Sequence, residues 1–140
     1  MRIVILSHAH PTFSKGGGEI AAYNLFKGIN QTNKHEAWFV ACADAKLMHL
    51  GTPVAALNER EYLIAGNAGI SHLTATIDLG DDSDFAEMLR NIQPDVVHFH
   101  HYIFLGVEMI RAAKRVCPNA KIVLTLHEYI AICMNYVQSA

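Results

Sequence analysis

Four short runs of apolar residues constrain the fold of this chain most strongly. They are residues 3–6, 38–41, 96–99 and 122–126, and helix-like or polar segments separate them. The first run, IVIL, has three β-branched residues out of four, a composition that favours a strand. Strands this apolar are typical of a parallel sheet whose two faces are both covered by helices. We therefore predict that the four runs are buried strands of one mostly parallel sheet.

Segments with helical periodicity lie between these runs. Residues 81–91 begin with capping oxygens and end before Pro94, and residues 102–116 close with a basic turn. Residues 19–30 form the first predicted helix, with an apolar face made by Ala22, Leu25, Phe26 and Ile29. Parallel strands joined by helices require right-handed crossovers. The expected fold class is α/β, a three-layer α/β/α Rossmann-like domain that is half of a doubly wound fold.

The segment at residues 44–76 is the least regular part of the chain. It contains Pro53 and several scattered glycines, and its only periodic pieces are short, such as residues 59–65. A connection this long in a small domain usually holds small elements of its own. We expect one or two short helices or strands there, and residues 75–79 are expected to pair at an edge of the sheet. The last residues, 130–140, show no clean period.

Composition restricts the class of protein. The chain has 140 residues, enough for one domain, with 51% hydrophobic residues, 17% charged residues and a net charge of −2. Because there is no basic block, nucleic-acid binding is not expected. No apolar run is long enough to cross a bilayer, and the first residues lack a signal-peptide pattern. Three widely spaced cysteines, Cys42, Cys117 and Cys133, are interpreted as reduced, mostly buried thiols of a cytoplasmic protein.

A glycine-rich loop follows the first apolar run. After Pro11, residues Gly16, Gly17 and Gly18 come directly before the first predicted helix. Glycines let a ligand approach the backbone, and the N–H groups at a helix start favour an anion. The pattern predicts a phosphate or diphosphate cradle, and the alternative is a flexible loop that happens to be rich in glycine. It is neither a dinucleotide fingerprint, because Ala21 replaces the last glycine, nor a P-loop, because no lysine follows.

Polar residues, most of them histidines, collect where the predicted strands end. The carboxyl ends of parallel strands lie along one edge of a sheet, so these residues are expected to converge at a ligand crevice. His98 and His100 alternate with Phe99, so they are predicted to share one face. The residues at these ends are Ser7, His8, His98, His100, His101, His127 and Glu128.

A zinc site made by His98, His100 and His127 is one alternative, because neutral imidazoles bind zinc well. The hydrolase pattern H-x-H-x-D-H would need aspartate where Tyr102 stands. A histidine at a strand end is more often a hydrogen-bonded structural residue, so we predict no metal site. Cys133 has no paired base at a recognisable spacing and is not expected to act as a nucleophile.

Three segments together resemble family 4 glycosyltransferases of the GT-B fold. The opening RIVILSHAHPTFSKGGGE resembles the family's strand, proline-containing loop and Gly-Gly-x-Glu, although Thr12 stands where a second proline is usual. The segment QPDVVHFHH at residues 93–101 resembles the strand P-D-V-V-H-x-H. The segment IVLTLHEY at residues 122–129 resembles the strand that ends in T-x-H-[D/E]. The order and spacing of the segments agree over nearly the whole chain.

The resemblance implies the N-terminal, acceptor-side domain of a retaining glycosyltransferase. Such an enzyme would move a sugar from a nucleotide-sugar donor to a glycan or lipid-linked acceptor, in polysaccharide or glycoconjugate synthesis, without a cofactor. By the resemblance, the donor diphosphate lies at Gly16, Gly17 and Gly18, and His127 is catalytic beside the transferred sugar. The resemblance further implies an acceptor side lined by Glu19, His100, His101 and Glu128.

The family's donor-binding C-terminal domain, with its paired glutamates, is absent from these 140 residues. We therefore expect the chain to be inactive alone and to bind donor weakly. The full-length enzyme is expected in the cytoplasm, with peripheral association at the inner face of the membrane left open. Two other classes stay open, the metal-dependent hydrolase and a non-catalytic Rossmann-like binding module. A nicotinamide-dependent oxidoreductase is disfavoured because the dinucleotide fingerprint is missing.

Overall fold

A single six-stranded sheet organises the chain. The computed structural model describes residues 1–49, 52–66 and 74–127. The strands are β1 (Arg2–Ser7), β2 (Glu36–Asp44), β3 (Val54–Ala56), β4 (Glu61–Gly66), β5 (Val96–His100) and β6 (Lys121–Thr125). They lie in the order β3-β4-β2-β1-β5-β6, and all neighbours are parallel except β3 and β4. The predicted α/β fold class and the four predicted strands are confirmed.

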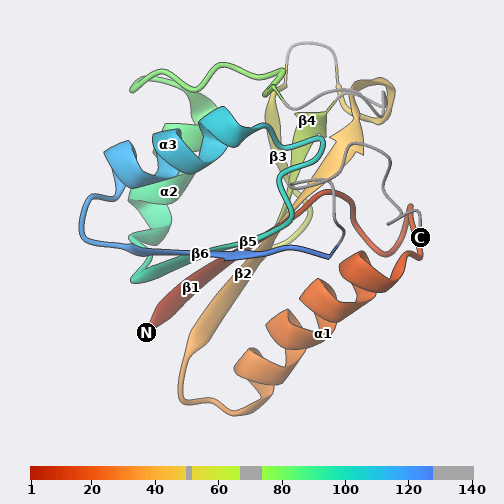
Figure 1. Ribbon diagram of the computed structural model, residues 1–140, viewed down its shortest axis with the longest axis vertical. Coiled ribbons are helices and arrows are strands. Elements are labelled where there is room, and N and C mark those ends of the chain that lie inside the picture. Colours follow the sequence, from red (N-terminus) through yellow and green to blue (C-terminus); the bar gives the residue numbers. More distant parts are fainter. Residues whose placement is uncertain (50–51, 67–73, 128–140) are drawn as a thin grey trace, which may run out of the picture.

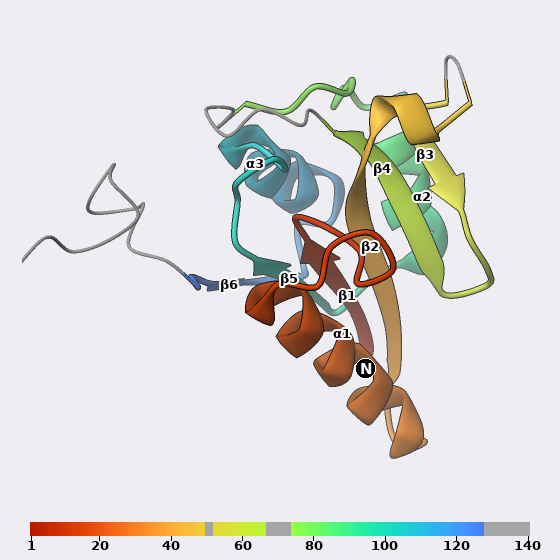
Figure 2. The same cartoon turned by 90° about the vertical axis from the view of Figure 1, so that its right-hand side faces the viewer.

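Helices cover the sheet on both faces, which makes three layers (Figures 1 and 2). Helix α1 (Gly17–Gln31) packs on one face, and α2 (Asp84–Ile92) and α3 (Val107–Val116) pack on the other. Side chains of β1 alternate between the two cores, because successive residues of a strand point to opposite faces. Ile3 and Ile5 join the core under α1, whereas Val4 and Leu6 join the core under α2 and α3.

Local sequence signals explain where α2 begins and ends. The Ser83 side chain caps its first turn by accepting a hydrogen bond from the backbone N–H of Ala86 at 3.3 Å. Gln93 ends the helix in the left-handed conformation, and Pro94 follows it. The predicted boundaries of this helix are therefore close to those observed.

The other two helices differ from their predicted ranges. Helix α1 begins two residues earlier than expected, at Gly17, and Gly16 is its N-cap. Helix α3 was expected from residue 102 but begins at Val107, because Gly106 has a φ of +83° and the chain turns before it. The expected inward position of Leu25 is wrong, since that side chain is 38% exposed, whereas Ala22 and Phe26 are buried.

The irregular segment contributes more to the sheet than the sequence suggested. It holds a short 3-10 helix, η1 (Ala45–Leu47), and the strands β3 and β4. Strand β4 extends the parallel sheet beside β2, and β3 folds back on β4 as an antiparallel edge. The expected edge pairing of residues 75–79 is wrong, because they form no strand and the edge position is taken by β3.

Strand β6 is not the buried strand that its apolar sequence predicted. Val123 and Leu124 are 40% and 42% exposed, and the adjoining Leu126 is 46% exposed. The reason is position, because β6 is the outermost strand and only Ile122 of its apolar residues packs against the core. The sequence identified a strand correctly, and burial then depended on neighbours that the sequence does not specify.

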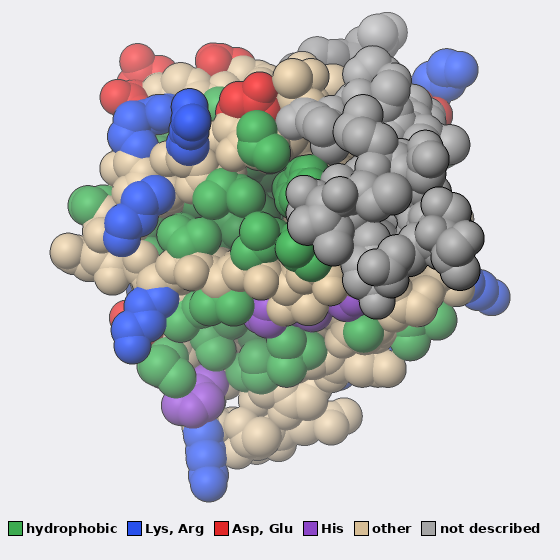
Figure 3. Space-filling view, in the orientation of Figure 1, with side chains coloured by type: hydrophobic (Ala, Val, Ile, Leu, Met, Phe, Trp, Pro, Cys, Tyr) green, Lys and Arg blue, Asp and Glu red, His purple; other side chains and the backbone are tan. Residues whose placement is uncertain are grey.

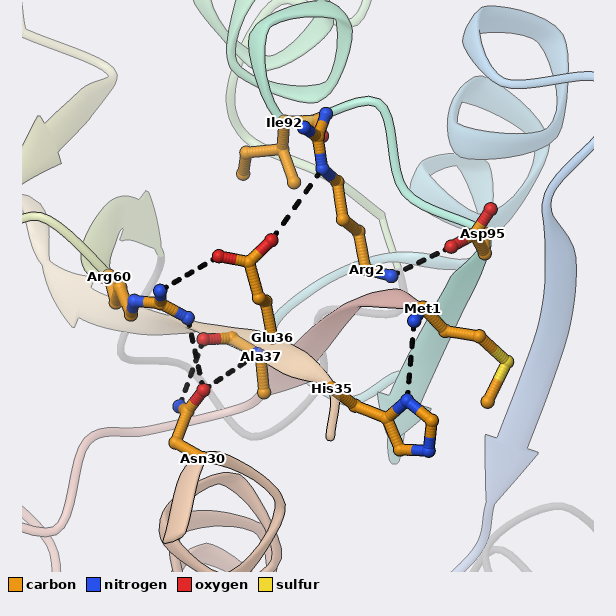
Figure 4. A network of polar contacts seen from close by, with 9 residues as sticks. All are labelled: Met1, Arg2, Asn30, His35, Glu36, Ala37, Arg60, Ile92 and Asp95. Atoms are coloured by element: carbon orange, nitrogen blue, oxygen red, sulfur yellow. Dashed lines mark hydrogen bonds and ion pairs between the residues drawn. The ribbon is translucent and has the colours of Figure 1, made fainter. Parts of the chain in front are cut away.

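Polar contacts hold together the amino ends of the strands (Figure 4). The Arg2 backbone N–H donates to Asp95 at 2.7 Å, and the Arg60 guanidinium bonds Glu36 at 2.9 Å and Asn30 at 3.1 Å. Asn30 in turn bonds both the N–H and the carbonyl of Ala37, at 2.9 and 3.1 Å. This network, called the amino-edge network below, ties α1 to β1, β2 and β5.

Two further sequence expectations concern the cysteines and membrane spans. Cys42 is a buried free thiol and Cys117 a half-buried one, while Cys133 lies outside the described residues. None of the described helices is long and apolar enough to span a membrane.

Candidate functional site

The side chains of β1 and β5 that face α1 change from apolar to polar at the carboxyl edge. Ile3 and Ile5 of β1 give way to Ser7, and Val96 of β5 gives way to His98 and His100. Ser7 and His100 are paired in register between the two strands, and both are buried. The polar edge therefore lies between β1 and β5, where the strand order reverses and where open α/β sheets bind ligands.

Three histidines meet at this edge, as the sequence predicted. The rings of His98 and His100 are 4.3 Å apart, and His100 Nδ1 lies 3.0 Å from His127 Nε2. The rings of His100 and His127 are stacked, with centroids 5.2 Å apart. His98 Nε2 is in turn 2.8 Å from the Thr125 hydroxyl. Figure 3 shows histidine side chains gathered beside apolar side chains on the face that presents β6.

Burial favours the neutral form of two of these histidines, His98 and His100. Desolvation, together with the nearby His98, His127 and His8, lowers the pKa of His100 to about 4. Burial, and then the charge of His127, also lowers the pKa of His98. The contact between His100 Nδ1 and His127 Nε2 holds one proton, so one ring donates and the other accepts. Near neutral pH, His98 and His100 are therefore neutral imidazoles that can form hydrogen bonds.

The glycine loop lies directly against the cluster. A Cβ on Gly18 would lie 3.3 Å from His127 Cδ2 and 3.4 Å from His8 Cε1, so a side chain there would press on both rings. A Cβ on Gly16 would collide with the Glu19 carboxylate, at 2.3 Å. A Cβ on Gly17 would meet nothing within 4 Å, so this position is open. The predicted neighbourhood of the glycines and His127 is therefore present.

The amino terminus of α1 beside His127 has no side-chain cap. Gly16 is the N-cap, and within the described residues no side chain makes a capping hydrogen bond there. Ile20 N–H is the first to reach a helical acceptor, the Gly16 carbonyl at 3.1 Å. The N–H groups of Gly17 and Gly18 are thus available at the positive end of the helix dipole.

Glu19 holds the loop in place from beneath. Its side chain is buried and accepts a hydrogen bond from the Ser14 hydroxyl at 2.6 Å, and His8 Nε2 lies 3.3 Å away. Burial by itself would raise the pKa of this carboxyl. The hydrogen bonds from Ser14 and the backbone, together with His8, outweigh burial and lower the pKa. The carboxylate is therefore ionised, and it fastens the loop to the first turn of α1.

A second histidine–glutamate pair was not anticipated from the sequence. His10 Nε2 lies 2.9 Å from Glu61, and His10 Nδ1 accepts a hydrogen bond from Thr12 N–H at 3.2 Å. Since Nδ1 accepts, Nε2 is the donor to the carboxylate. Burial raises the pKa of Tyr23, and the neighbouring Glu61 raises it further. The alternation of His8 and His10 after the first strand is the only sequence signal that could have pointed to the contact between His10 and Glu61.

Two residues of the predicted acceptor side, His101 and Glu128, are not among the described side chains that form the histidine cluster. His101 is buried, with a φ of +73°, and its Nδ1 accepts from the N–H groups of Tyr102 and Ile103, at 3.0 and 3.2 Å. The structure thus places it inside the turn after β5. Glu128 lies outside the described residues.

Buried polar atoms without a hydrogen-bond partner mark the same edge. Among the described residues, Ser7 Oγ, His8 Nδ1 and His100 Nε2 are such atoms. Native proteins pair most buried polar groups, so these unpaired atoms single out the edge as a candidate ligand site. Within the described ranges, no group of three or more histidine, cysteine, aspartate or glutamate side chains is arranged to hold a metal ion.

Comparison with known protein families agrees with this geometry. The family described as Glycosyltransferase Family 4 matches residues 15–138, which is most of the chain. The chain belongs to Glycosyltransferase Family 4. The match includes the glycines, the carboxyl end of β5 and His127, whereas Ser7, His8 and His10 of the site precede the matched range. A search of curated proteins found no match.

Proposed function

We propose that this Family 4 chain is the acceptor-side domain of a retaining glycosyltransferase of the GT-B type. The enzyme transfers a sugar from a nucleotide-sugar donor to a glycan or lipid-linked acceptor, in polysaccharide or glycoconjugate synthesis. One observation carries the proposal. His127 lies against Gly18 at the uncapped start of α1, on the edge where a ligand would complete the pairing of buried polar atoms.

The start of α1 is proposed to receive the donor diphosphate. The free N–H groups of Gly17 and Gly18 can donate to phosphate oxygens, and the helix dipole favours negative charge there. As the bond between the sugar and the diphosphate breaks, negative charge grows on the leaving oxygen, and these groups stabilise it. A second, donor-binding domain supplies the rest of the positive charge.

His127 is the proposed catalytic residue, beside the transferred sugar. Its ring is stacked on His100 and bonded to it, so its orientation is set by a buried neighbour. An imidazole in this position can hydrogen-bond a hydroxyl of the sugar in the transition state. His100 then acts as a positioning residue, since it fixes the His127 ring.

The metal-dependent hydrolase receives less support. Its three histidines are close together, but His100 Nδ1 and His127 Nε2 face each other across a hydrogen bond. That geometry directs two ring nitrogens at one another instead of at a shared ion. A non-catalytic binding module remains the alternative that experiment must exclude.

Sugar transfer by the full-length protein tests the proposed function. The assay presents a panel of nucleotide-sugars and detects release of the nucleoside diphosphate in the presence of saccharide acceptors. We expect one donor to be consumed, and the product to keep the anomeric configuration of the donor. Absence of release with every donor, from protein with a cooperative melting transition, would favour the binding module.

A further inference from the structure

A second cavity lies beside the histidine cluster and has a different chemical character. It has a volume of about 420 Å³ and lies where β1, β2 and β4 end. His8 belongs to both sites, because it contacts the Gly18 position and also lines this cavity. A molecule in the cavity would therefore sit next to the proposed transfer site. The volume is within the usual range of small-molecule sites.

The walls of this cavity are mainly apolar. Phe13 and Leu47 line it and are 52% and 61% exposed. Phe104 and Cys42 also line it. Large exposed apolar side chains around a cavity indicate a binding surface, which the apolar face of a partner covers. The flat rings of Phe13 and Phe104 can pack against a ligand ring that has an apolar side, since aromatic rings present broad flat surfaces.

The carboxyl groups of the cavity belong to Glu19 and Asp44, and its other polar side chains are His8 and Ser14. Among the described residues, no lysine or arginine lines it. Lys15 and Lys46 are near these residues in sequence, but both are exposed and outside the lining. Oδ1 of Asp44 accepts a hydrogen bond from Lys46 N–H at 2.9 Å, and within the described residues Oδ2 has no partner. A carboxylate oxygen accepts hydrogen bonds from hydroxyls and repels phosphate.

We propose that this cavity binds an uncharged sugar ring, the terminal residue of the acceptor, and excludes acceptors that present a phosphate there. The apolar face of the ring packs on Phe13 and Phe104, and its hydroxyls donate to Asp44. This inference rests on the proposed function, because it names the acceptor chemistry of the same domain. The ring can belong to a free oligosaccharide or to a saccharide on a lipid, which present the same chemistry to this cavity.

Binding of small probes to the full-length protein tests the charge preference without any turnover. The probes are methyl glycosides of the common hexoses and the matching hexose 6-phosphates, measured by saturation-transfer NMR and titration. We expect at least one neutral glycoside to bind, and its 6-phosphate to bind at least about tenfold more weakly. Binding of no neutral glycoside, or tighter binding of a phosphate than of its neutral partner, would overturn the proposal.

Cavity variants locate the binding. Phe13→Ala and Leu47→Ala should each raise the Kd of the neutral glycoside by about three- to tenfold. Leu57→Ala is the matched control, because Leu57 is also exposed, at 48%, but does not line the cavity. All three side chains are on the surface, so unchanged melting temperatures are expected. Equal effects of Leu47→Ala and Leu57→Ala would contradict the assignment.

A charge variant tests the exclusion of phosphate. Asp44→Asn keeps an oxygen for the Lys46 N–H but removes the negative charge, so 6-phosphates should bind several-fold better. Asp82→Asn, on an exposed turn outside the cavity, should change nothing. If Asp44→Asn bound the 6-phosphates as weakly as the unchanged protein does, the charge of Asp44 would not be the cause of their exclusion.

The two saccharide sources are separated by comparing a methyl glycoside with its dodecyl glycoside in the transfer assay. A large preference for the dodecyl form assigns a lipid-linked acceptor, and equal use assigns a free glycan. Transfer only to phosphorylated acceptors would disprove this inference while supporting the proposed function. Glycoside binding without transfer from any donor would support the cavity and disprove the transferase.

Discussion

The two ends of the sheet differ in how completely their polar groups are hydrogen-bonded. At the amino edge, Arg2, Glu36, Arg60 and Asn30 are bonded to one another or to backbone groups in a closed network (Figure 4). At the carboxyl edge, by contrast, Ser7 and His100 are buried and have polar atoms without partners among the described residues. A structural edge satisfies its polar groups within the chain, whereas a binding edge leaves some of them for a ligand.

The edges also differ in the kind of charge that they carry. The amino-edge ion pairs are largely exposed, with side-chain exposures of 47% and 51% for Arg2 and Glu36, so each pair adds little stability. The carboxyl edge has neutral histidines, whose burial resists protonation. The change in unfolding free energy at low pH should therefore come mainly from residues of the carboxyl edge. Substitutions should change activity only at that edge.

The largest expected effect is the loss of stability in acid. His100 has a pKa of about 4 when folded and about 6.5 when unfolded. Below pH 6.5 the unfolded chain therefore binds a proton that the folded chain does not, and the free energy of unfolding falls until about pH 4. The loss is about 3 kcal/mol, measured by urea denaturation between pH 7 and pH 4. His100→Gln should remove most of it, and the lowered pKa of His98 accounts for a remainder.

His35→Gln, at the amino edge, serves as the control for this experiment. His35 is the histidine partner of the Met1 amino group, at 3.2 Å. If both variants flattened the pH dependence equally, the comparison of the two edges would be wrong.

The next effect is on catalysis by the full-length enzyme. His127→Ala should lower kcat by about 100-fold, or about 2.7 kcal/mol, because a transition-state contact is lost. The melting temperature should hold, since the His127 side chain is exposed and its removal takes away only its contacts with His100 and Gly18. A drop in melting temperature with unchanged kcat per folded molecule would assign His127 a structural role instead.

Asn30→Ala should produce the reverse pattern. The substitution leaves the N–H and the carbonyl of the buried Ala37 without their partner, so the protein should lose about 2 kcal/mol of stability. The kcat of the full-length enzyme should be unchanged below the melting transition, because Asn30 is far along α1 from its amino terminus. Reduced kcat at full folding would show that the two edges are coupled.

The smallest effect distinguishes two glycines of the same helix. A Cβ on Gly17 or on Gly28 meets nothing within 4 Å, so alanine at either position should stabilise the protein by about 0.5 kcal/mol. Only Gly17→Ala should weaken donor binding by the full-length enzyme, because only Gly17 is at the proposed diphosphate site. Equal donor KM values for both variants would argue against a diphosphate there.

Residue patterns were sufficient to predict the strands β1, β2, β5 and β6 and the meeting of the three histidines. Apolar runs identify strands because burial demands them, and the parallel arrangement brings the strand ends to one edge. The pattern was insufficient for β3 and β4, since short strands in an irregular segment leave little periodicity. The pairing of His10 with Glu61 was also beyond reach, because the two residues are 51 positions apart.

The amino-acid sequence by itself determined the α/β architecture, the glycine-led start of α1 and the family resemblance, since these depend on residues close together in the chain. Only the tertiary structure decided that Gly18 lies against His127, that β6 is exposed, and that Glu19 is buried under its loop. Packing partners come from distant segments, and burial, pKa and ligand access depend on those partners. The chemistry of the carboxyl edge is therefore a property of the folded chain.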